Sequence, residues 1–493
     1  MKFHSRFTQE LSPALFSPVE AQSFKSPTLL ASSRRLQEDL NLQEIGSDEV
    51  LILSGQKTAD GSKPIATVYA GHQFGHWAGQ LGDGRALLLG EILDKNNHLQ
   101  EVQLKGAGPT PYSRRGDGLA VLRSSLREFV ASEAMHFLNV PTTRALSLTL
   151  TGDSVVRDMF YDGNPQNEKG AIVSRVAPSF LRFGHFEYLA WQDLKSELQK
   201  LIDFTIRHYY HPIDLQNPKR NLLLFQNVTA KTAELMAHWA RVGFVHGVMN
   251  TDNMSILGLT IDYGPFGFLD SYQPDWTPNT TDLPGRRYSF QNQPAIAKWN
   301  LARLAEAFLS LEIESIEDYQ LALEDFDRIY RQYWRQFHFE KLSLEISAQS
   351  DHTFIEKLLK LMADTELDMT FGFQKLNEPN LTLSDLQSVS YKKEWTGKDL
   401  LGWRDWLNEY KTHPKKPVKN SNPHFVPRNF ILQTLIEKTE AGDTSLLKAF
   451  LAAIETPYEA FSAPHQELED LIMKMRPDWA LNKPGCSALS CSS

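Results

Sequence analysis

The sequence is poor in cysteine: it has two in 493 residues, and both lie within the last eight positions. A disulfide framework for the body of the protein is therefore excluded. The sequence also lacks an uninterrupted apolar stretch of the roughly 18 residues that a membrane span requires. Its first 20 residues contain Arg6, Glu10 and two prolines where a secretory signal would need an apolar core. These absences predict a cytoplasmic protein that is not bound to a membrane.

The sequence also has no excess of basic residues, and its formal net charge at pH 7 is −9. A nucleic-acid partner is therefore not expected, since binding to phosphate backbones needs a dominant basic face. The composition, 41% apolar and 23% charged, is typical of a globular protein, and no internal repeat is evident. The length allows two lobes with additions.

The order of patterns along the chain predicts an α+β fold. Between about residues 65 and 190 the sequence is rich in glycine and in short alternating runs, which predict strands over 86–92 and 101–105. An apolar stripe predicts a helix over 121–138. Later segments predict a helix over 229–242 that ends at Gly243, another that begins at Pro294, and a long one capped by Ser315. Residues 412–424 read as a surface connector.

We therefore expect a strand-containing N-terminal lobe over 1–190, a larger helical lobe over 191–480, and a flexible tail over 481–493 that carries both cysteines. Cys486 and Cys491 could close a small disulfide loop or exchange with a redox partner. They could equally be two exposed, reduced thiols without a role.

The segment 245–264 carries the most specific chemistry. Asn253 precedes Asp262 by nine residues, and the apolar stretch between them predicts a short hairpin. An amide oxygen and a carboxylate are hard ligands of the kind that Mg²⁺ takes together with nucleotide phosphates. Protein kinases place an Asn seven residues after a His and follow it with Asp-Phe-Gly. Here His246 and Asn253 keep that separation, and Asp262 begins Asp-Tyr-Gly.

The base of a kinase is missing, because Val248 occupies the position of the catalytic aspartate. Asp252 is the nearest carboxylate able to accept a proton from an attacking hydroxyl, although an aspartate here could also cap a turn. His246 is interpreted as a packed scaffold residue.

A strand lysine and a helix glutamate form a second candidate pair. Alternation puts Lys105 and Gln103 on one face of their strand, and Glu128 follows on the predicted helix. Kinases use such a pair to hold a lysine against phosphate. Two solvated surface charges are the alternative, and the segment 245–264 makes the pair the better interpretation.

Glycines and arginines supply candidate phosphate contacts. Gly82, Gly84 and Arg85 lie in a glycine-rich turn that could bring backbone amides to phosphates or could be an ordinary hairpin turn. The polar loop 106–118 ends in Asp117 and Gly118. Arg175 and Arg182 flank a Pro-Ser turn and suit bidentate contacts to polyphosphate, although structural salt bridges are an equal alternative for each.

These motifs together resemble the selenoprotein O family. The resemblance rests on 246–253, Tyr69-Ala-Gly-His-Gln-Phe-Gly-His-Trp-Ala-Gly-Gln-Leu-Gly-Asp-Gly-Arg85, Leu104-Lys-Gly-Ala-Gly-Pro-Thr-Pro-Tyr-Ser-Arg-Arg-Gly-Asp-Gly118 and Asn422-Pro-His-Phe-Val-Pro-Arg-Asn429. It extends over nearly the whole chain, and selenocysteine-containing members have that residue at the position of Cys491. The family is similar to protein kinases in fold and was long classed as pseudokinase.

The resemblance implies an enzyme that binds ATP with its phosphates reversed relative to kinases. It implies transfer of AMP to protein hydroxyls, and some members are described as using UTP with Mn²⁺. Carried over, Asn253 and Asp262 would hold Mg²⁺ or Mn²⁺, and Asp252 would be the base. Lys105 and Glu128 would be the ion pair. The nucleotide would be lined by Gly82, Gly84, Arg85, Lys105, Asp117, Gly118, Arg175, Arg182 and Asp262.

The sequence thus predicts a protein adenylyltransferase that acts on Ser, Thr or Tyr hydroxyls. One alternative is an atypical kinase that transfers the γ-phosphate, and another is an ATP-binding scaffold without catalysis. An adenylyltransferase would transfer the label of α-labelled ATP to the acceptor protein, whereas a kinase would transfer the label of γ-labelled ATP. A scaffold would bind ATP and form no covalent product.

Overall fold

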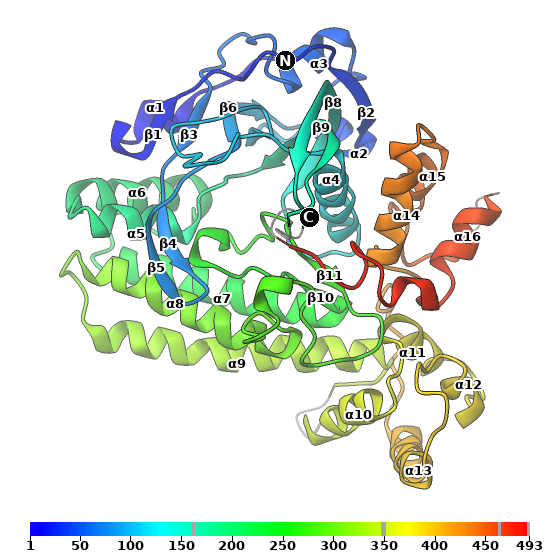
Figure 1. Ribbon diagram of the computed structural model, residues 1–493. Coiled ribbons are helices and arrows are strands. Elements are labelled where there is room, and N and C mark those ends of the chain that lie inside the picture. The colour runs from blue at the N-terminus through cyan, green and yellow to red at the C-terminus, as the bar shows by residue number, and fades with distance from the viewer. Residues whose placement is uncertain (160–162, 347–351, 462–464, 491–493) are drawn as a thin grey trace.

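A seven-stranded antiparallel sheet forms the upper part of the molecule. The computed structural model describes residues 1–159, 163–346, 352–461 and 465–490. The strands are ordered β1-β3-β6-β7-β9-β8-β2 (Figure 1). Their bounds are β1 Phe16–Pro18, β2 Thr28–Ser32, β3 Ile65–Thr67, β6 Ala86–Leu93, β7 Leu99–Lys105, β8 Arg144–Arg157 and β9 Gln166–Ala177. The predicted strands over 86–92 and 101–105 are confirmed as β6 and β7.

The two faces of this sheet differ in what covers them. Val102 and Leu104 of β7 pack into a core with the helices α2 (Arg34–Asp39) and α3 (Ser47–Leu53). The opposite face is covered by α4 (Leu122–Phe137), which packs on β8 and β9. Gln103 and Lys105 point toward this second face, as the alternation predicted, so β7 presents polar groups where α4 can pair with them.

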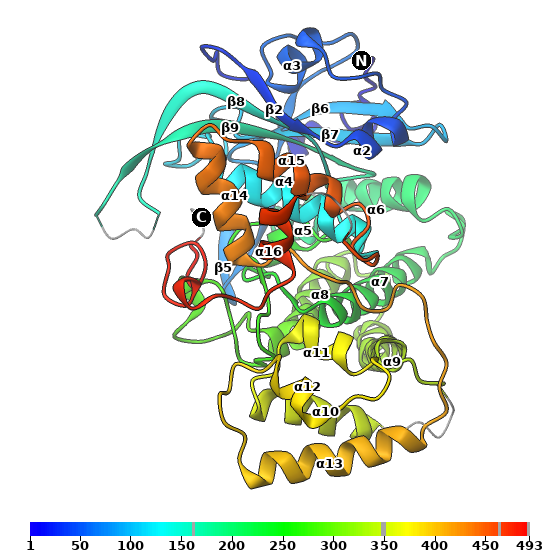
Figure 2. The same ribbon diagram turned by 90° about the vertical axis from the view of Figure 1, so that its right-hand side faces the viewer.

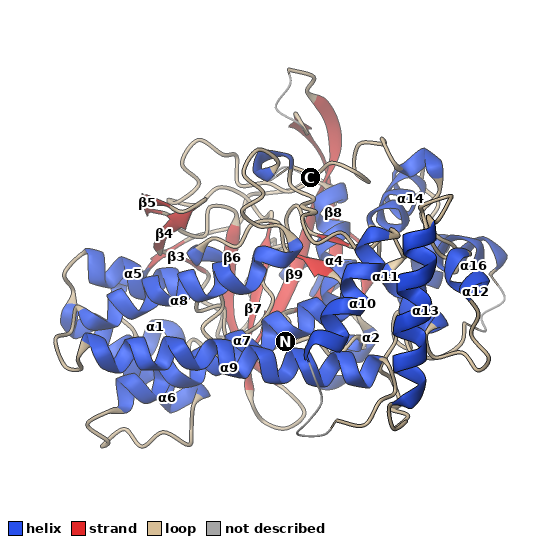
Figure 3. Ribbon diagram, turned by 90° about the horizontal axis from the view of Figure 1, so that it is seen from below, coloured by secondary structure: helices blue, strands red, loops and turns tan. Residues whose placement is uncertain are grey.

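Five helices form the body below the sheet (Figure 3). They are α5 Phe183–Trp191, α6 Lys195–Tyr209, α7 Arg220–Val242, α8 Gln293–Leu309 and α9 Ile316–Lys341. The helix predicted over 229–242 begins nine residues earlier than expected, and it ends at Gly243, whose φ of 72° favours glycine. The hydroxyl of Ser315 accepts the backbone N–H of Asp318 and caps α9 as predicted.

Besides the short α1 (Arg6–Glu10) near the N-terminus, the remaining helices form two groups (Figure 2). Helices α10 (His352–Asp364), α11 (Met369–Lys375), α12 (Leu383–Gln387) and α13 (Gly397–Thr412) enclose a separate apolar core. Helices α14 (Asn429–Glu440), α15 (Ser445–Ala453) and α16 (Gln466–Ile472) lie beside α4. One continuous core joins α4 and the sheet to α5–α9, so the division near residue 190 remains a prediction.

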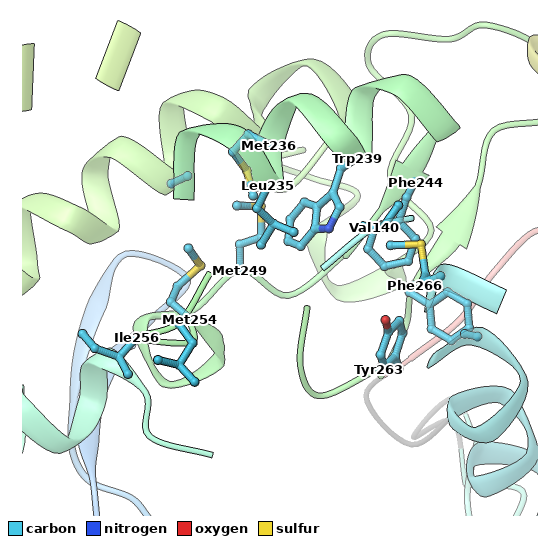
Figure 4. Packing of buried hydrophobic residues seen from close by; sticks show 14 of the residues in the cluster. Val140, Leu235, Met236, Trp239, Phe244, Met249, Met254, Ile256, Tyr263 and Phe266 are labelled. Atoms are coloured by element: carbon cyan, nitrogen blue, oxygen red, sulfur yellow. The ribbon is translucent and has the colours of Figure 1, made fainter. Parts of the chain in front are cut away.

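The hairpin predicted between Asn253 and Asp262 is wrong. The backbone of Ser255 pairs with Arg182 and that of Thr260 pairs with Thr142, so the two halves of the segment have partners elsewhere in the chain. The strands that do pair here lie outside the segment: β10 Phe244–Val245 and β11 Gly267–Phe268. Figure 4 shows the apolar side chains that anchor the segment, among them Met249, Met254, Ile256, Tyr263 and Phe266.

The expected flexible tail is packed as far as Ser490. Leu489 is fully buried and its backbone pairs with Asn279, while Cys486 is buried beside Asn429. Burial raises the pKa of the Cys486 thiol to about 12, which disfavours the reactive thiolate. Cys491 lies outside the described residues. Within the described ranges, no helix is long and apolar enough to cross a bilayer.

A buried carboxyl group ties the sheet to the start of α5. Glu101 of β7 is 1% exposed and accepts hydrogen bonds from the Ser179 hydroxyl (3.0 Å) and the Phe180 N–H (2.7 Å). Burial, with the nearby Glu91, raises the pKa of Glu101 to about 8. The connection from β9 to α5 is therefore held by a side chain that is neutral at pH 7.

We expect the melting temperature of Glu101→Gln relative to that of wild type to be higher at pH 9 than at pH 6. The folded pKa of Glu101 lies above its ordinary value, so the stability it contributes is complete below about pH 4.5 and is lost as pH rises through about 8. Glutamine cannot ionise and escapes this loss. Melting temperatures at both pH values measure the difference, and Glu44→Gln, at an exposed position, is the matched control. An equal pH dependence of Glu101→Gln and wild type would contradict the assignment.

Candidate active site

A cavity of about 980 Å³ lies between the sheet and the segment 248–265. It contains every residue that the sequence predicted to act as base, to hold the metal or to line the nucleotide. These are Gly82, Gly84, Arg85, Lys105, Asp117, Gly118, Arg175, Arg182, Asp252, Asn253 and Asp262. Glu128 lies behind Lys105. Residues that are up to 180 positions apart in the chain are therefore brought to one surface.

The predicted ion pair is present. Lys105 Nζ lies 2.7 Å from Glu128 Oε2, and both side chains are almost completely buried. Burial lowers the pKa of Lys105, and the Glu128 carboxylate opposes that effect. The second oxygen of Glu128 accepts from Arg175 Nη1 at 3.1 Å, so one glutamate of α4 holds cations from two neighbouring strands. The alternative of two solvated surface charges is wrong.

Asp262 is surrounded by cations. Its Oδ1 lies 2.5 Å from Arg175 Nη1 and 3.8 Å from Lys105 Nζ, and its Oδ2 pairs with Arg182. These charges, Arg182 first, outweigh burial and hold the pKa of Asp262 well below its usual range. The backbone of Asp262 has a φ of 55°, which turns the chain sharply at the cavity wall.

Arg182 joins three parts of the site. Its Nη1 also donates to the backbone oxygen of Asp252 at 2.9 Å, and its guanidinium lies 4.8 Å from the ring centre of Tyr69. For Arg175 and Arg182 the sequence left phosphate contacts and structural salt bridges open. In the structure both arginines form salt bridges with Asp262, and both side chains also line the cavity.

Asp252 and Asn253 lie in a short 3₁₀ turn, η2 (Thr251–Asn253). Asn253 Nδ2 donates to Val248 O at 2.9 Å, which leaves the amide oxygen as its unused acceptor. Asp252 Oδ2 accepts from Gln73 Nε2 at 3.2 Å, whereas its Oδ1 is buried without a hydrogen-bond partner. Burial raises the pKa of Asp252 to about 6.

His246 is a scaffold residue, as predicted. Its Nε2 donates to Ile261 O at 2.8 Å, and its Nδ1 accepts the N–H of Val248. This pattern requires the neutral imidazole, and burial lowers the pKa of His246 accordingly. The ring links the segment that carries Asn253 to the backbone just before Asp262.

The glycine-rich turn is not the ordinary hairpin turn that its sequence left open, and its contact with phosphates stays a prediction. It crosses from β5 (His76–Gln80) to β6, which do not pair with each other, so it is no ordinary hairpin turn. The loop 106–118 packs on it. A Cβ at Gly82 would lie 2.5 Å from the Tyr112 side chain, and Thr110 Oγ1 donates to Asp83 O at 2.7 Å. The close approach of that loop therefore requires residues without a Cβ at these positions.

Cations without carboxylate partners line the outer part of the cavity. Within the described ranges, Arg85, Arg114 and Arg115 form no ion pair. Asp117 is engaged, because Arg157 binds both its oxygens at 2.7 Å. No group of three or more His, Cys, Asp or Glu side chains in the described part of the chain could hold a metal alone. Any ion here would need ligands from a bound nucleotide or water besides Asn253 and Asp262.

Sequence reasoning missed three polar contributors. Asp83 is buried and accepts from the Thr67 hydroxyl at 2.6 Å. Gln73 contacts the candidate base, and Arg157 neutralises Asp117. Their partners are distant in the chain, and only the position of Asp83 inside the Gly-Asp-Gly turn could have drawn attention to it.

Comparisons with known proteins agree on the family. The family model described as protein adenylyltransferase SelO matches residues 1–455. The chain is 47% identical to the protein nucleotidyltransferase YdiU of Methylobacillus flagellatus over 499 residues, which cover 97% of this chain and 95% of that protein. YdiU proteins of Azoarcus sp. (strain BH72) and Rhodopirellula baltica are 46% and 44% identical, with 99% of this chain and 96% of each relative covered. The resemblance predicted from the sequence is confirmed, and the chain belongs to the SelO family of protein adenylyltransferases.

Proposed function

We propose that this enzyme transfers AMP from ATP to hydroxyl groups of proteins. Membership in the SelO family and similarity to YdiU nucleotidyltransferases support the transfer of a nucleotide rather than of a γ-phosphate. One observation carries the assignment to this cavity. A buried carboxylate with one unpartnered oxygen, Asp252, faces the same space as the Asn253–Asp262 pair and as arginines that form no ion pair with a described residue. A base, an anion site and hard oxygen ligands are the parts that such a transfer needs.

Asn253 and Asp262 fit a divalent cation. The amide oxygen of Asn253 is unused, and Asp262 is ionised at any working pH, with a second lone pair on each oxygen. Two protein ligands completed by phosphate and water oxygens are usual for Mg²⁺, and Mn²⁺ accepts the same donors. When bound, the ion would neutralise charge on the polyphosphate.

Asp252 would take the proton of the acceptor. In the proposed step the hydroxyl oxygen bonds to the α-phosphorus, the bond from that phosphorus to the bridging oxygen breaks, and pyrophosphate leaves. The proton of the hydroxyl passes to the carboxylate of Asp252, which lines the cavity and whose Oδ1 has no competing hydrogen bond. Gln73 holds the other oxygen and thereby fixes the direction of the free lone pairs.

The cations would serve the leaving group. Lys105, Arg175 and Arg182 carry three positive charges against the two negative charges of Glu128 and Asp262. Among these five side chains there is therefore one more positive than negative charge, and the buried carboxyl groups of Asp83 and Asp252 also lie close to Arg182. Together with Arg85, Arg114 and Arg115 the three cations favour a ligand that gains negative charge as the bond breaks.

The arrangement also supports a kinase-like, two-lobed organisation. A strand lysine meets a helix glutamate beneath an antiparallel sheet, and the Asn253 and Asp262 segments approach from the helical body. In this interpretation β7 and α4 belong to the smaller lobe. Substrate preference for ATP over UTP, the choice of Mg²⁺ or Mn²⁺, reversed phosphates and a cytoplasmic location stay predictions.

The position of the transferred label tests the function. With a mixed protein extract as acceptor, α-labelled ATP should mark proteins and γ-labelled ATP should not. Asp252→Asn keeps the shape of the side chain but removes the base, so we expect transfer to fall by about a hundredfold or more. Asp214→Asn, at an exposed position outside the cavity, is the control. Transfer of γ-label would indicate a kinase, and ATP binding without any transfer would indicate a scaffold.

Substitution of the two proposed metal ligands should have different effects on the stability of the protein. Asn253→Ala loses one hydrogen bond, so we expect a melting temperature close to wild type and an increase of about tenfold or more in the Mg²⁺ concentration for half-maximal transfer. Asp262→Asn also removes the ion-pair partner of Arg182, while Arg175 keeps its ion pair with Glu128, and loss of one partner from a buried pair typically costs about 3–5 kcal/mol.

Metal titration of activity and thermal melting of both variants together measure this contrast. An Asp262→Asn protein as stable as wild type would refute the structural half of the argument. Unchanged metal dependence in Asn253→Ala would refute the ligand assignment.

A further inference from the structure

An aromatic surface lies next to the candidate site, on a hairpin that stands apart from the large sheet. The hairpin consists of β4 (Ala70–Gln73) and β5, and it lies beside α5 and α8 (Figures 1 and 3). Trp77 on β5 is 41% exposed and Trp191 at the end of α5 is 50% exposed, with their ring centres 5.7 Å apart. His72 links Trp77 to Trp299 of α8 through edge contacts of 5.0 and 5.4 Å. We call Trp77, Trp191, Trp299 and Arg287 the Trp77 surface.

The backbone of β5 offers a free edge. Within the described residues β4 and β5 form a sheet of two strands, so one side of β5 has no neighbouring strand. Around Gly79 there is open space, because a Cβ placed there would meet no atom within 4 Å. An extended peptide can add to such an edge, with backbone hydrogen bonds for affinity and side-chain contacts for specificity.

The hairpin is fixed to the segment that carries the candidate base. His72 N–H donates to Thr251 Oγ1 at 2.8 Å, and Gln73 Nε2 donates to Asp252 Oδ2 at 3.2 Å. A Cβ at Gly71 would lie only 2.7 Å from Thr251 Oγ1, so the two segments are in close contact. A chain bound along β5 would therefore be held at a defined position relative to Asp252, and β5 leads directly to Leu81 and Gly82 in the cavity wall.

Arg287 places a positive charge on the Trp77 surface. Arg287 lies 4.8 Å from the ring centre of Trp299 and against the hairpin turn at Gly75. It forms no ion pair with any described residue and its buried Nε has no hydrogen-bond partner, while the rest of the guanidinium interacts with the Tyr288 hydroxyl and with the charge of Asp282. A guanidinium stacked on an aromatic ring keeps its edge available for a carboxylate.

We propose that the Trp77 surface docks the acceptor protein, through an extended segment that lies along β5 and places an acidic side chain at Arg287. Apolar side chains of that segment would cover Trp77 and Trp191, and its hydroxyl would reach the mouth of the cavity. This inference rests on the proposed function, since it identifies the kind of polypeptide that receives the nucleotide.

Peptide binding tests the docking surface independently of catalysis. The probes are two fluorescein-labelled decapeptides that share one tyrosine and flanking valines, one with three glutamates and one with three lysines. Fluorescence anisotropy measures their dissociation constants. We expect the glutamate peptide to bind about tenfold more tightly, although the net charge of −9 on the protein would favour the lysine peptide if binding were unspecific.

Two variants and a control locate the binding. Arg287→Glu should reverse the preference between the peptides, and Trp77→Ala should weaken both by about tenfold. Trp479→Ala removes a tryptophan that is similarly exposed (49%) but lies outside the Trp77 surface, so binding should stay as in wild type. Melting temperatures check folding, and the charge reversal keeps the test valid if Trp77→Ala unfolds.

The outcomes separate this inference from the proposed function. The docking proposal is refuted if wild type binds both peptides equally tightly. It is also refuted if Arg287→Glu and Trp77→Ala both bind the peptides as tightly as wild type. Transfer of α-label to the peptides is measured in parallel. Selective binding without transfer supports docking and contradicts the proposed function, whereas transfer without charge preference contradicts docking alone.

Discussion

The buried ion cluster around Asp262 is the constraint on which the rest of the site depends. It joins β7 through Lys105, α4 through Glu128, β9 through Arg175 and the start of α5 through Arg182. Charges removed from water are costly unless each is paired at short range, so four separate elements must meet with little freedom. The cluster fixes the cavity before any ligand enters.

The apolar packing and the ion cluster reinforce one another through the segment 244–266. Tyr263 and Phe266 lie in the core next to Asp262 (Figure 4), and His246 joins this part to the Asn253 turn through Ile261. A shift of the core would therefore move both proposed metal ligands together. This coupling explains how a turn without regular strands can hold two ligands in a fixed relation: its backbone is held at Ser255 and Thr260 by distant segments.

The sequence predicted what depends on local periodicity and failed where distant partners decide. The alternation in β7 placed Lys105 and Gln103 correctly, and the kinase-like segment 245–264 favoured the pairing of Lys105 with Glu128 over two surface charges. The segment after Asn253 reads like a hairpin, yet its backbone hydrogen bonds are with Pro141, Thr143, Leu181 and Phe183, which no local pattern reveals. The polar composition of the tail likewise concealed the buried Leu489.

The choice that sequence left open for Arg175 and Arg182 has a physical resolution. Asp262 is surrounded by these arginines, and a bound polyphosphate would compete with it for the same guanidinium groups. Because the carboxylate also has unused lone pairs, a divalent ion can replace part of the attraction that the arginines give up. Under the proposed function, the salt bridges to Asp262 would hold the site in shape until phosphate contacts replaced them on binding of the nucleotide and its metal. The structural and the proposed functional roles of the two arginines would then be consecutive.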